Sequence, residues 1–332
     1  MEWIRHILYE YDLTLSAIEA EGHHVWKVQT NRGMFRLSRQ MEAEEQLVFT
    51  SGWLQRLRQS GIRSVIPYSV TKYGESVVSS ADSRYILQPW IQPVCSVRDV
   101  SGWERQLMRQ LGRIHQASAA AAREAGTIGL TPSVVQKRWL DGMNAVRELA
   151  HQYTRHQKGG AFGLLVCESE SYVISLVERA VERLGHTISN LIADEKLPHV
   201  LCHGRLRSHY VLVAGQDRRH LYLTGFERAG YDGAVRDLTV CVRHCGDDVD
   251  WNVRLGRRWL AAYEAERQLS EAERQLLSCY LLYPEPMMRA AKSCLDTAKV
   301  GRSEMGRWMH IWRRHLPRLF AMQQFAFEII EK

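Results

Sequence analysis

An arginine-rich loop between two apolar runs is the part of this sequence best suited to chemistry. The loop reads His203-Gly204-Arg205-Leu206-Arg207. The guanidinium groups of Arg205 and Arg207 could together bind a phosphate, a sulfate or a partner's carboxylate without a metal ion, because arginine presents several donors in a planar fork. They could equally form internal salt bridges with acidic residues that follow, Glu227, Asp232 and Asp237. The residues alone leave both interpretations open.

The frame of this loop resembles the catalytic loop of the aminoglycoside phosphotransferase and choline kinase-like family. In that family His-Gly-Asp is followed, after four residues, by Asn and an apolar strand. His203 and Gly204 keep the frame, whereas Arg205 stands at the catalytic Asp and Tyr210 at the metal-binding Asn. The resemblance thus retains the scaffold of the loop and changes its chemical groups.

A second segment resembles the metal-binding strand of the same family. Leu223-Thr224-Gly225-Phe226-Glu227 places Gly225 at the metal-chelating Asp, and the later Arg236-Asp237-Leu238 retains the Asp237 that braces the loop in the family. Phosphoryl transfer needs a carboxylate near the attacking hydroxyl and hard oxygen ligands that hold Mg²⁺ against the phosphates. Arginine, tyrosine and glycine offer neither. We therefore expect no catalytic residue, no metal and no cofactor of the ordinary mechanism.

Strand-like runs dominate the first part of the chain. Residues 25–30 and 34–37 flank Asn31-Arg32-Gly33 and predict a β-hairpin. It resembles the small-lobe hairpin of the family, whose second strand ends in a phosphate-binding Lys; Ser38 stands there, and a shift of one residue would bring Arg39 into its place. Shorter strands are predicted at 68–70, 76–78 and 85–91, the last of which resembles the hinge between the lobes.

The rest of the sequence has mainly helical periodicity. Residues 44–60 predict an amphipathic helix, and an apolar stripe predicts another that ends near His115, which we interpret as a packed histidine. We therefore expect an α+β, bilobal protein kinase-like fold. It would have a small lobe of sheet and one helix at 1–88, a hinge at 89–94 and a large helical lobe at 95–332.

The C-terminal third carries a softer resemblance. Helices are predicted at 251–265 and 302–332, and Ser270 with Glu273 predicts a capping box. Together with Leu282-Tyr283-Pro284-Glu285-Pro286, this part resembles the bacterial spore-coat branch of the family, the CotS-type proteins. The resemblance implies other spore-coat proteins as partners and the spore coat as location.

A dense basic and aromatic stretch, residues 307–320, lies in the tail. It could dock on nucleic acid, a membrane surface or another coat protein. We favour an aromatic stripe packed on the large lobe, and we expect Pro317 to end or kink the helix. Two further residues, Cys241 and Cys245, lie one helical turn apart; because no second pair would complete a zinc site, we expect both to be buried thiols.

The composition excludes several classes of protein. Of 332 residues, 45% are hydrophobic, and the net charge of +7 arises from interleaved basic and acidic residues, so nucleic acid is not the expected partner. Seven scattered cysteines predict free thiols. With no signal core and no apolar run long enough for a bilayer, we expect cytoplasmic synthesis without a transmembrane segment. Neither a P-loop nor a serine-hydrolase elbow occurs. The oligomeric state is left open.

Three hypotheses follow. The preferred one is a pseudokinase, degenerate at Arg205, Tyr210, Gly225 and Ser38, that serves as a structural or assembly protein. The alternative is an active small-molecule phosphotransferase that uses ATP and Mg²⁺, in which Glu227 or Asp232 takes over the metal and Arg39 or Arg205 binds the phosphates. The third is a basic interaction module that uses the tail.

Overall fold

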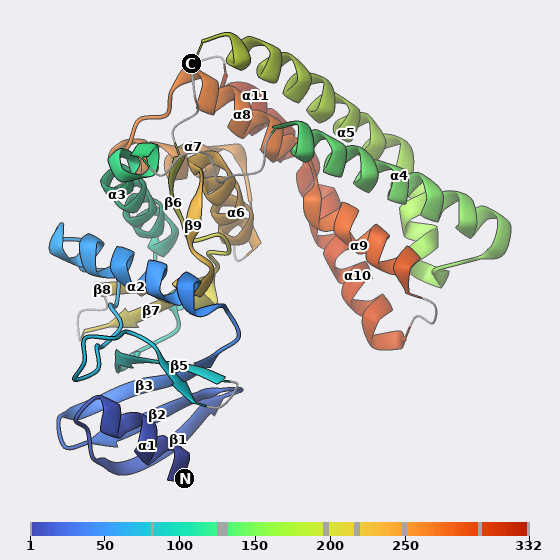
Figure 1. Ribbon diagram of the computed structural model, residues 1–332. Coiled ribbons are helices and arrows are strands. Elements are labelled where there is room, and N and C mark those ends of the chain that lie inside the picture. Colours follow the sequence, from blue (N-terminus) through green and yellow to red (C-terminus); the bar gives the residue numbers. More distant parts are fainter. Residues whose placement is uncertain are drawn as a thin grey trace. The chain divides into compact units, whose positions relative to one another are not determined.

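The chain forms two compact units in the computed structural model (Figure 1). The structure describes residues 2–80, 83–124, 132–194, 199–215, 220–247, 251–297 and 301–330. The first unit covers Met1–Gly126, Val200–Tyr231 and Ala262–Arg267; the second covers Thr127–His199, Asp232–Ala261 and Gln268–Lys332. The lobe boundaries expected from the sequence, with a hinge at 89–94, stay a prediction.

A five-stranded antiparallel sheet forms the base of the first unit. Its strands follow the order β1-β2-β3-β5-β4. Their bounds are Leu15–Gly22 for β1, Val25–Thr30 for β2, Gly33–Gln40 for β3, Val78–Ser80 for β4 and Ser83–Pro89 for β5. The predicted hairpin is confirmed, because β2 and β3 pair up to Thr30 opposite Gly33.

Two of the predicted short strands differ from the structure. Residues 68–70 form no strand: Ser69 donates one backbone hydrogen bond to Leu87 (2.7 Å), and one bond is too few to make a ladder. The run predicted at 76–78 contributes only Val78, where pairing with Tyr85 begins.

Helices lie on both faces of the sheet. The sequence patterns did not predict α1 (Glu2–Glu10), whose Ile4, Ile7 and Leu8 are buried in a cluster with Val28, Leu37 and Leu87 of the sheet. The predicted helix at 44–60 is confirmed as α2 (Glu44–Gln59). α1 therefore covers the face of the sheet on which Leu37 of β3 lies.

The first unit also contains α3 (Trp103–Glu124) and a series of short elements. All four members of the predicted stripe on α3 are buried: Trp103, Leu107, Leu111 and Ile114. The short elements are η1 (Val97–Asp99), η2 (Ser208–Tyr210), β7 (Val211–Ala214), β8 (His220–Leu223) and η3 (Phe226–Arg228), together with most of β6 (His199–Cys202) and the first half of β9 (Gly230–Gly233). β7 pairs with β8, and β6 pairs with β9.

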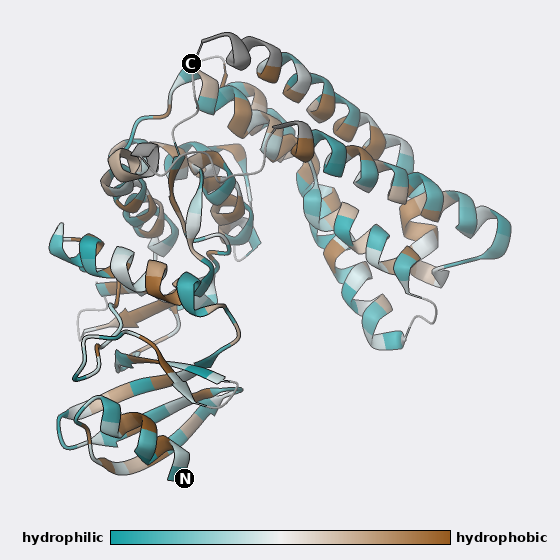
Figure 2. Cartoon of the chain, viewed as in Figure 1, coloured by the Kyte–Doolittle hydropathy of each residue, from teal (hydrophilic) through white to brown (hydrophobic). Residues whose placement is uncertain are grey.

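The second unit is helical. It contains α4 (Pro132–His156), α5 (Gly160–Asp194), α6 (Ala234–Asp247), most of α7 (Val253–Glu264), α8 (Glu271–Leu282), α9 (Glu285–Asp296), α10 (Arg302–His315), η4 (Leu316–Arg318) and α11 (Leu319–Glu328). Figure 2 shows hydrophobic and hydrophilic residues alternating along α4 and α5, as expected for helices with one buried side.

One helix of this bundle meets the length and composition of a membrane span, which the sequence analysis did not expect. Within α5, Gly160–Ile188 is apolar enough, and 44% of its most apolar window is buried. Phe162, Val166 and Val173 of this helix are fully buried. α5 packs against α4, α8 and α10, as the core helix of a bundle does.

The aromatic stripe of the tail packs inward, as favoured from the sequence. Trp308 and Trp312 are 3% and 0% exposed, and both rings contact Phe162 of α5. The indole of Trp312 donates to the hydroxyl of Ser169 (2.8 Å). Pro317 lies in η4, which separates α10 from α11, so the expected interruption of the helix is confirmed. Cys241 and Cys245 are buried thiols in α6, also as expected.

The predicted capping box is present at the start of α8. The Ser270 hydroxyl accepts from the Glu273 amide (3.2 Å), and the Glu273 carboxylate accepts from the Ser270 amide (3.0 Å). Ser270→Ala should therefore lower the free energy of unfolding by about 1 kcal/mol, measured by urea denaturation. Ser270→Asp, which keeps an accepting oxygen, should stay close to wild type; equal losses in both variants would contradict a capping role.

Candidate functional site

The loop after β6 is hydrogen-bonded to the segment that follows β8. His203 is 2% exposed, and its Nε2 donates a hydrogen bond to the carbonyl of Thr224 (2.8 Å). The next residue, Gly204, has φ +82°, in the left-handed region that favours glycine. The retained His-Gly frame thus positions one loop of the site against the other. The described residues show this structural role and no chemical one for His203.

Tyr210 packs directly against the backbone of Gly225. Gly225 has φ +83°, and a Cβ built there would lie 3.0 Å from Cγ of the Tyr210 ring and closer still to two of its edge carbons. The amide of Thr224 donates to the Tyr210 carbonyl (2.9 Å) and fixes the two segments in this register. The tyrosine ring therefore fills the space in which any side chain at position 225 would begin.

Arg205 forms an ion pair with a buried carboxylate. Its Nη2 lies 3.2 Å from Oε2 of Glu227, whose side chain is 7% exposed. The guanidinium also lies over the ring of Tyr210, 5.1 Å from its centroid. Of the two outcomes left open by the sequence, the internal salt bridge is therefore formed by Arg205. Arg207 is exposed, and the described part of the chain gives it no ion pair, so its role in anion binding stays a prediction.

A buried tyrosine is influenced by the charge of Glu227. Tyr68 is 4% exposed, and no described residue is a hydrogen-bond partner of its hydroxyl. Burial and the negative charge of Glu227 raise the pKa of Tyr68 well above its usual value. The phenol is therefore neutral at physiological pH, and Glu227 has its positive partner in Arg205.

Helix α2 is hydrogen-bonded to the backbone around η3. Gln46 Nε2 donates to the carbonyl of Ala229 (2.7 Å), and the Thr50 hydroxyl donates to the carbonyl of Phe226 (3.3 Å). The indole of Trp53 donates to the hydroxyl of Tyr231 (3.1 Å). The sequence analysis missed these residues, because their partners lie about 180 positions away in the sequence.

A surface ion pair reinforces this contact next to α2. Nε of Arg228 lies 2.8 Å from Oε1 of Glu42. Burial would raise the pKa of Glu42, but the hydrogen bond and charge of Arg228 outweigh it and hold this pKa below its ordinary value. Glu44 and Glu45, the acids of the first helical turn, are exposed, so Glu42 is the acid that holds the loop.

The register of β3 shows which way Ser38 and Arg39 face. Ser38 pairs with Ile86, whereas Arg39 pairs with Tyr85. Because neighbouring residues of a strand face opposite sides, Arg39 lies on the side of Leu37 and Tyr85, which belong to the cluster under α1. Ser38 and Arg39 therefore face opposite sides of the sheet, and a role of Arg39 in phosphate binding stays a prediction. Ser38 is 1% exposed and accepts from Gln40 Nε2 (3.0 Å).

Asp232 and Asp237 belong to the second unit. Asp232 pairs with Arg236 and accepts from the amide of Gly233 (2.7 Å); burial raises its pKa. Asp237 is 1% exposed in the first turn of α6. Its bracing role, and a role of Asp232 as a residual acid, stay predictions.

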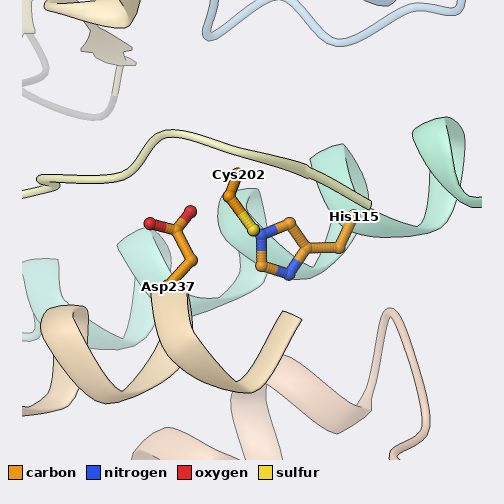
Figure 3. A group of neighbouring side chains, drawn as sticks. All are labelled: His115, Cys202 and Asp237. Carbon is orange, nitrogen blue, oxygen red and sulfur yellow. The ribbon is translucent and has the colours of Figure 1, made fainter. Parts of the chain in front are cut away.

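His115 and Cys202 form a buried pair in the first unit (Figure 3). His115 is 0% exposed, and its Nδ1 lies 2.8 Å from the hydroxyl of Tyr263. One ring nitrogen and the Cys202 sulfur lie within 4.8 Å of each other. Because a structural zinc site needs four ligands, this pair does not make one. The interpretation of His115 as a packed histidine is confirmed.

Comparison with known proteins gives both a family and a fold. The family model described as "Spore coat putative kinase YutH" matches residues 4–307. A search of curated proteins by sequence finds no match. The solved structure of an aminoglycoside phosphotransferase from Alicyclobacillus acidocaldarius has a TM-score of 0.81 at 15% identity, covering 98% of this chain and 94% of that one.

Two further solved structures agree. A spectinomycin phosphotransferase in complex with ADP and spectinomycin has a TM-score of 0.67 at 14% identity, over 100% of this chain and 98% of that one. A microcompartment-associated aminopropanol kinase has 0.60 at 15% identity, over 100% and 99%. At such identities the likeness shows the fold alone, and the α+β, bilobal kinase-like fold expected from the sequence is confirmed.

Proposed function

This chain belongs to the spore-coat kinase family of the YutH type, and from that premise we propose that it is a catalytically inert, kinase-like structural or assembly protein of the spore coat. The family's description includes the word kinase, so the point that this proposal adds is that the site is inert. It rests first on one contact, that of the Tyr210 ring with the backbone of Gly225.

This contact argues against a metal site of the ordinary kind. The resemblance places the two Mg²⁺ ligands of the family at positions 210 and 225. Here one position has no side chain, and the ring from the other occupies the space that a ligand at 225 would need. Mg²⁺ requires oxygen ligands in an octahedral array, and a phenol ring packed on a glycine provides no such array. The residues present do not fit the metal, and we derive no catalytic step through it.

The charges of the site support the same proposal. A kinase keeps a carboxylate ready to accept a proton from the substrate hydroxyl. Arg205 stands at that position and reverses the charge, and it is neutralised by Glu227, 7% exposed, at 3.2 Å. Neither group of this pair is available for proton transfer while the pair persists. On the sheet, the uncharged Ser38 stands where the resemblance places the phosphate-binding Lys.

Calorimetric titration with ATP, with and without Mg²⁺, tests the proposal. We expect no binding that depends on Mg²⁺. Weak, metal-independent binding at low salt would fit exposed Arg207 and should then disappear in Arg207→Asp. Binding that requires Mg²⁺ and is lost in Glu227→Gln would contradict the proposal.

Mg²⁺-dependent binding that is lost in Glu227→Gln would instead favour the alternative, an active ATP-dependent phosphotransferase. It finds support in a neighbour of the same fold, the spectinomycin phosphotransferase in complex with ADP and spectinomycin. Glu227 is a buried acid two residues after Gly225, and in this alternative it would leave Arg205 for the metal. Arg205 would then bind phosphates.

Membership of this family also supports the proposed cellular location and partners. We propose that the protein is made in the cytoplasm, has no membrane-spanning segment and acts among other spore-coat proteins. The packing of α5 against α4, α8 and α10, with 44% of its apolar window buried, supports the absence of a span.

A further inference from the structure

One face of α10 is strongly basic and open to solvent. The segment Arg302–Arg318 carries five arginines and two histidines against a single acid, Glu304. Its tryptophans are buried against α5, so the opposite face presents Arg302, Arg307, His310 and Arg313, all exposed. This face is not explained by the kinase-like site, which lies in the first unit.

A groove of about 440 Å³ lies on this face. It is lined by Gly306, Met309, His310, Arg313 and Arg314. This lining combines cationic arginines and a histidine, which we call its rim, with Gly306 and the thioether side chain of Met309, which we call its floor. We name it the α10 groove.

Gly306 leaves the floor of the α10 groove open. A Cβ at this position would meet no atom within 4 Å, so packing inside the protein does not require glycine here. Glycine in a helix interior destabilises the helix relative to alanine. It also lets another chain approach the helix backbone closely. An open glycine between cationic side chains is what a docked segment would need.

Arg314 of the groove and the neighbouring Arg318 share one carboxylate. Nε of Arg314 and Nη1 of Arg318 lie 3.1 and 3.5 Å from Oδ1 of Asp247, whose Oδ2 is 3.2 Å from the ring of His244. One negative charge therefore faces two arginines and a histidine. Arg314 is held in place, while Arg313 is exposed and has no ion pair within the described ranges. The groove retains an excess of positive charge.

We propose that the α10 groove binds an acidic segment of another polypeptide, with Glu or Asp carboxylates on the arginine rim and an apolar side chain on the Met309 floor. The inference rests on the proposed structural role for its setting. A membrane is a poorer occupant, because the tryptophans that would anchor the helix are buried in the bundle. Nucleic acid is poorer too, since phosphates gain nothing from an apolar floor and α10 spans only about 21 Å.

Fluorescence anisotropy of a labelled peptide of alternating glutamate and leucine tests the proposal with the full chain. Binding should weaken as salt is raised. It should weaken at least tenfold in Arg313→Glu and in Gly306→Glu, which places a carboxylate over the floor of the groove. Gly306→Ala should bind like wild type. Arg138→Glu, at another exposed arginine of the second unit, is the matched charge control and should change the affinity less than twofold.

Three results would overturn the inference. One is no peptide binding by wild type at low salt. Another is an equal loss in Arg138→Glu, which would indicate unspecific charge attraction. The third is tighter binding of phosphatidylglycerol vesicles or duplex DNA than of the peptide, lost in the same variants. None of these measurements uses ATP. The ATP titration can therefore contradict the proposed function while the peptide experiment confirms binding at the α10 groove, or the other way round.

Discussion

Gly225→Ala should lower the free energy of unfolding by about 2–5 kcal/mol. Two effects add. A non-glycine residue at φ +83° costs about 1–2 kcal/mol, and overpacking against a well-placed ring costs about 1–3 kcal/mol. The new methyl group would lie 3.0 Å from Cγ of Tyr210 and nearer to two other ring atoms, so the ring must move. Urea denaturation of the purified variant measures the loss.

Gly204→Ala is the matched control for the backbone effect. Its φ of +82° is nearly the same, but its Cβ would meet only the Arg228 carbonyl at 3.5 Å, an ordinary contact. It should cost only about 1–2 kcal/mol. In a Tyr210→Ala background, Gly225→Ala should lose its packing part, with a coupling energy of about 1 kcal/mol or more. Equal costs for Gly225→Ala and Gly204→Ala would show that the ring does not fill this space.

The sequence frame predicted where the site lies but not how its parts fit together. Period and turn residues placed β2, β3, α2 and the stripe of α3, because those signals are local. The replacements at 205, 210 and 225 were visible one by one. That the tyrosine ring needs the glycine is a contact between residues 15 positions apart, and no pattern in one sequence carries it. Only the structure shows that the residues at these three positions form one packed arrangement.

The same limit explains the other misses. Gln46 and Glu42 contact the loop at 228–229 through side chains whose partners lie about 180 positions away. Glu42 lies just before α2, and its ion pair with Arg228 could not be read from the periodicity that predicted the helix. The register of Arg39 could not be fixed either, since one residue of shift reverses the face of a strand. The pairing of Arg39 with Tyr85 decides it.

Arg205→Asp should also lower stability by several kcal/mol, in the same range as Gly225→Ala. It restores the family's catalytic residue type, yet it removes the partner of Glu227, a carboxylate whose side chain is 7% exposed, and adds a second negative charge beside it. Removing one member of a buried ion pair costs about 3–5 kcal/mol, and the partial exposure of Arg205, 32%, reduces this to about 2–4 kcal/mol. Chemical denaturation at neutral pH measures the loss, and phosphoryl transfer from ATP should stay absent.

Two further variants separate charge repulsion from lost packing. Arg207→Asp makes the same change at an exposed arginine two residues away and should alter stability by no more than about 0.5 kcal/mol. Adding Glu227→Gln to Arg205→Asp removes the like charge and should restore part of the loss. A deficit that Glu227→Gln does not reduce would mean that the Arg205–Glu227 pair does not govern this site.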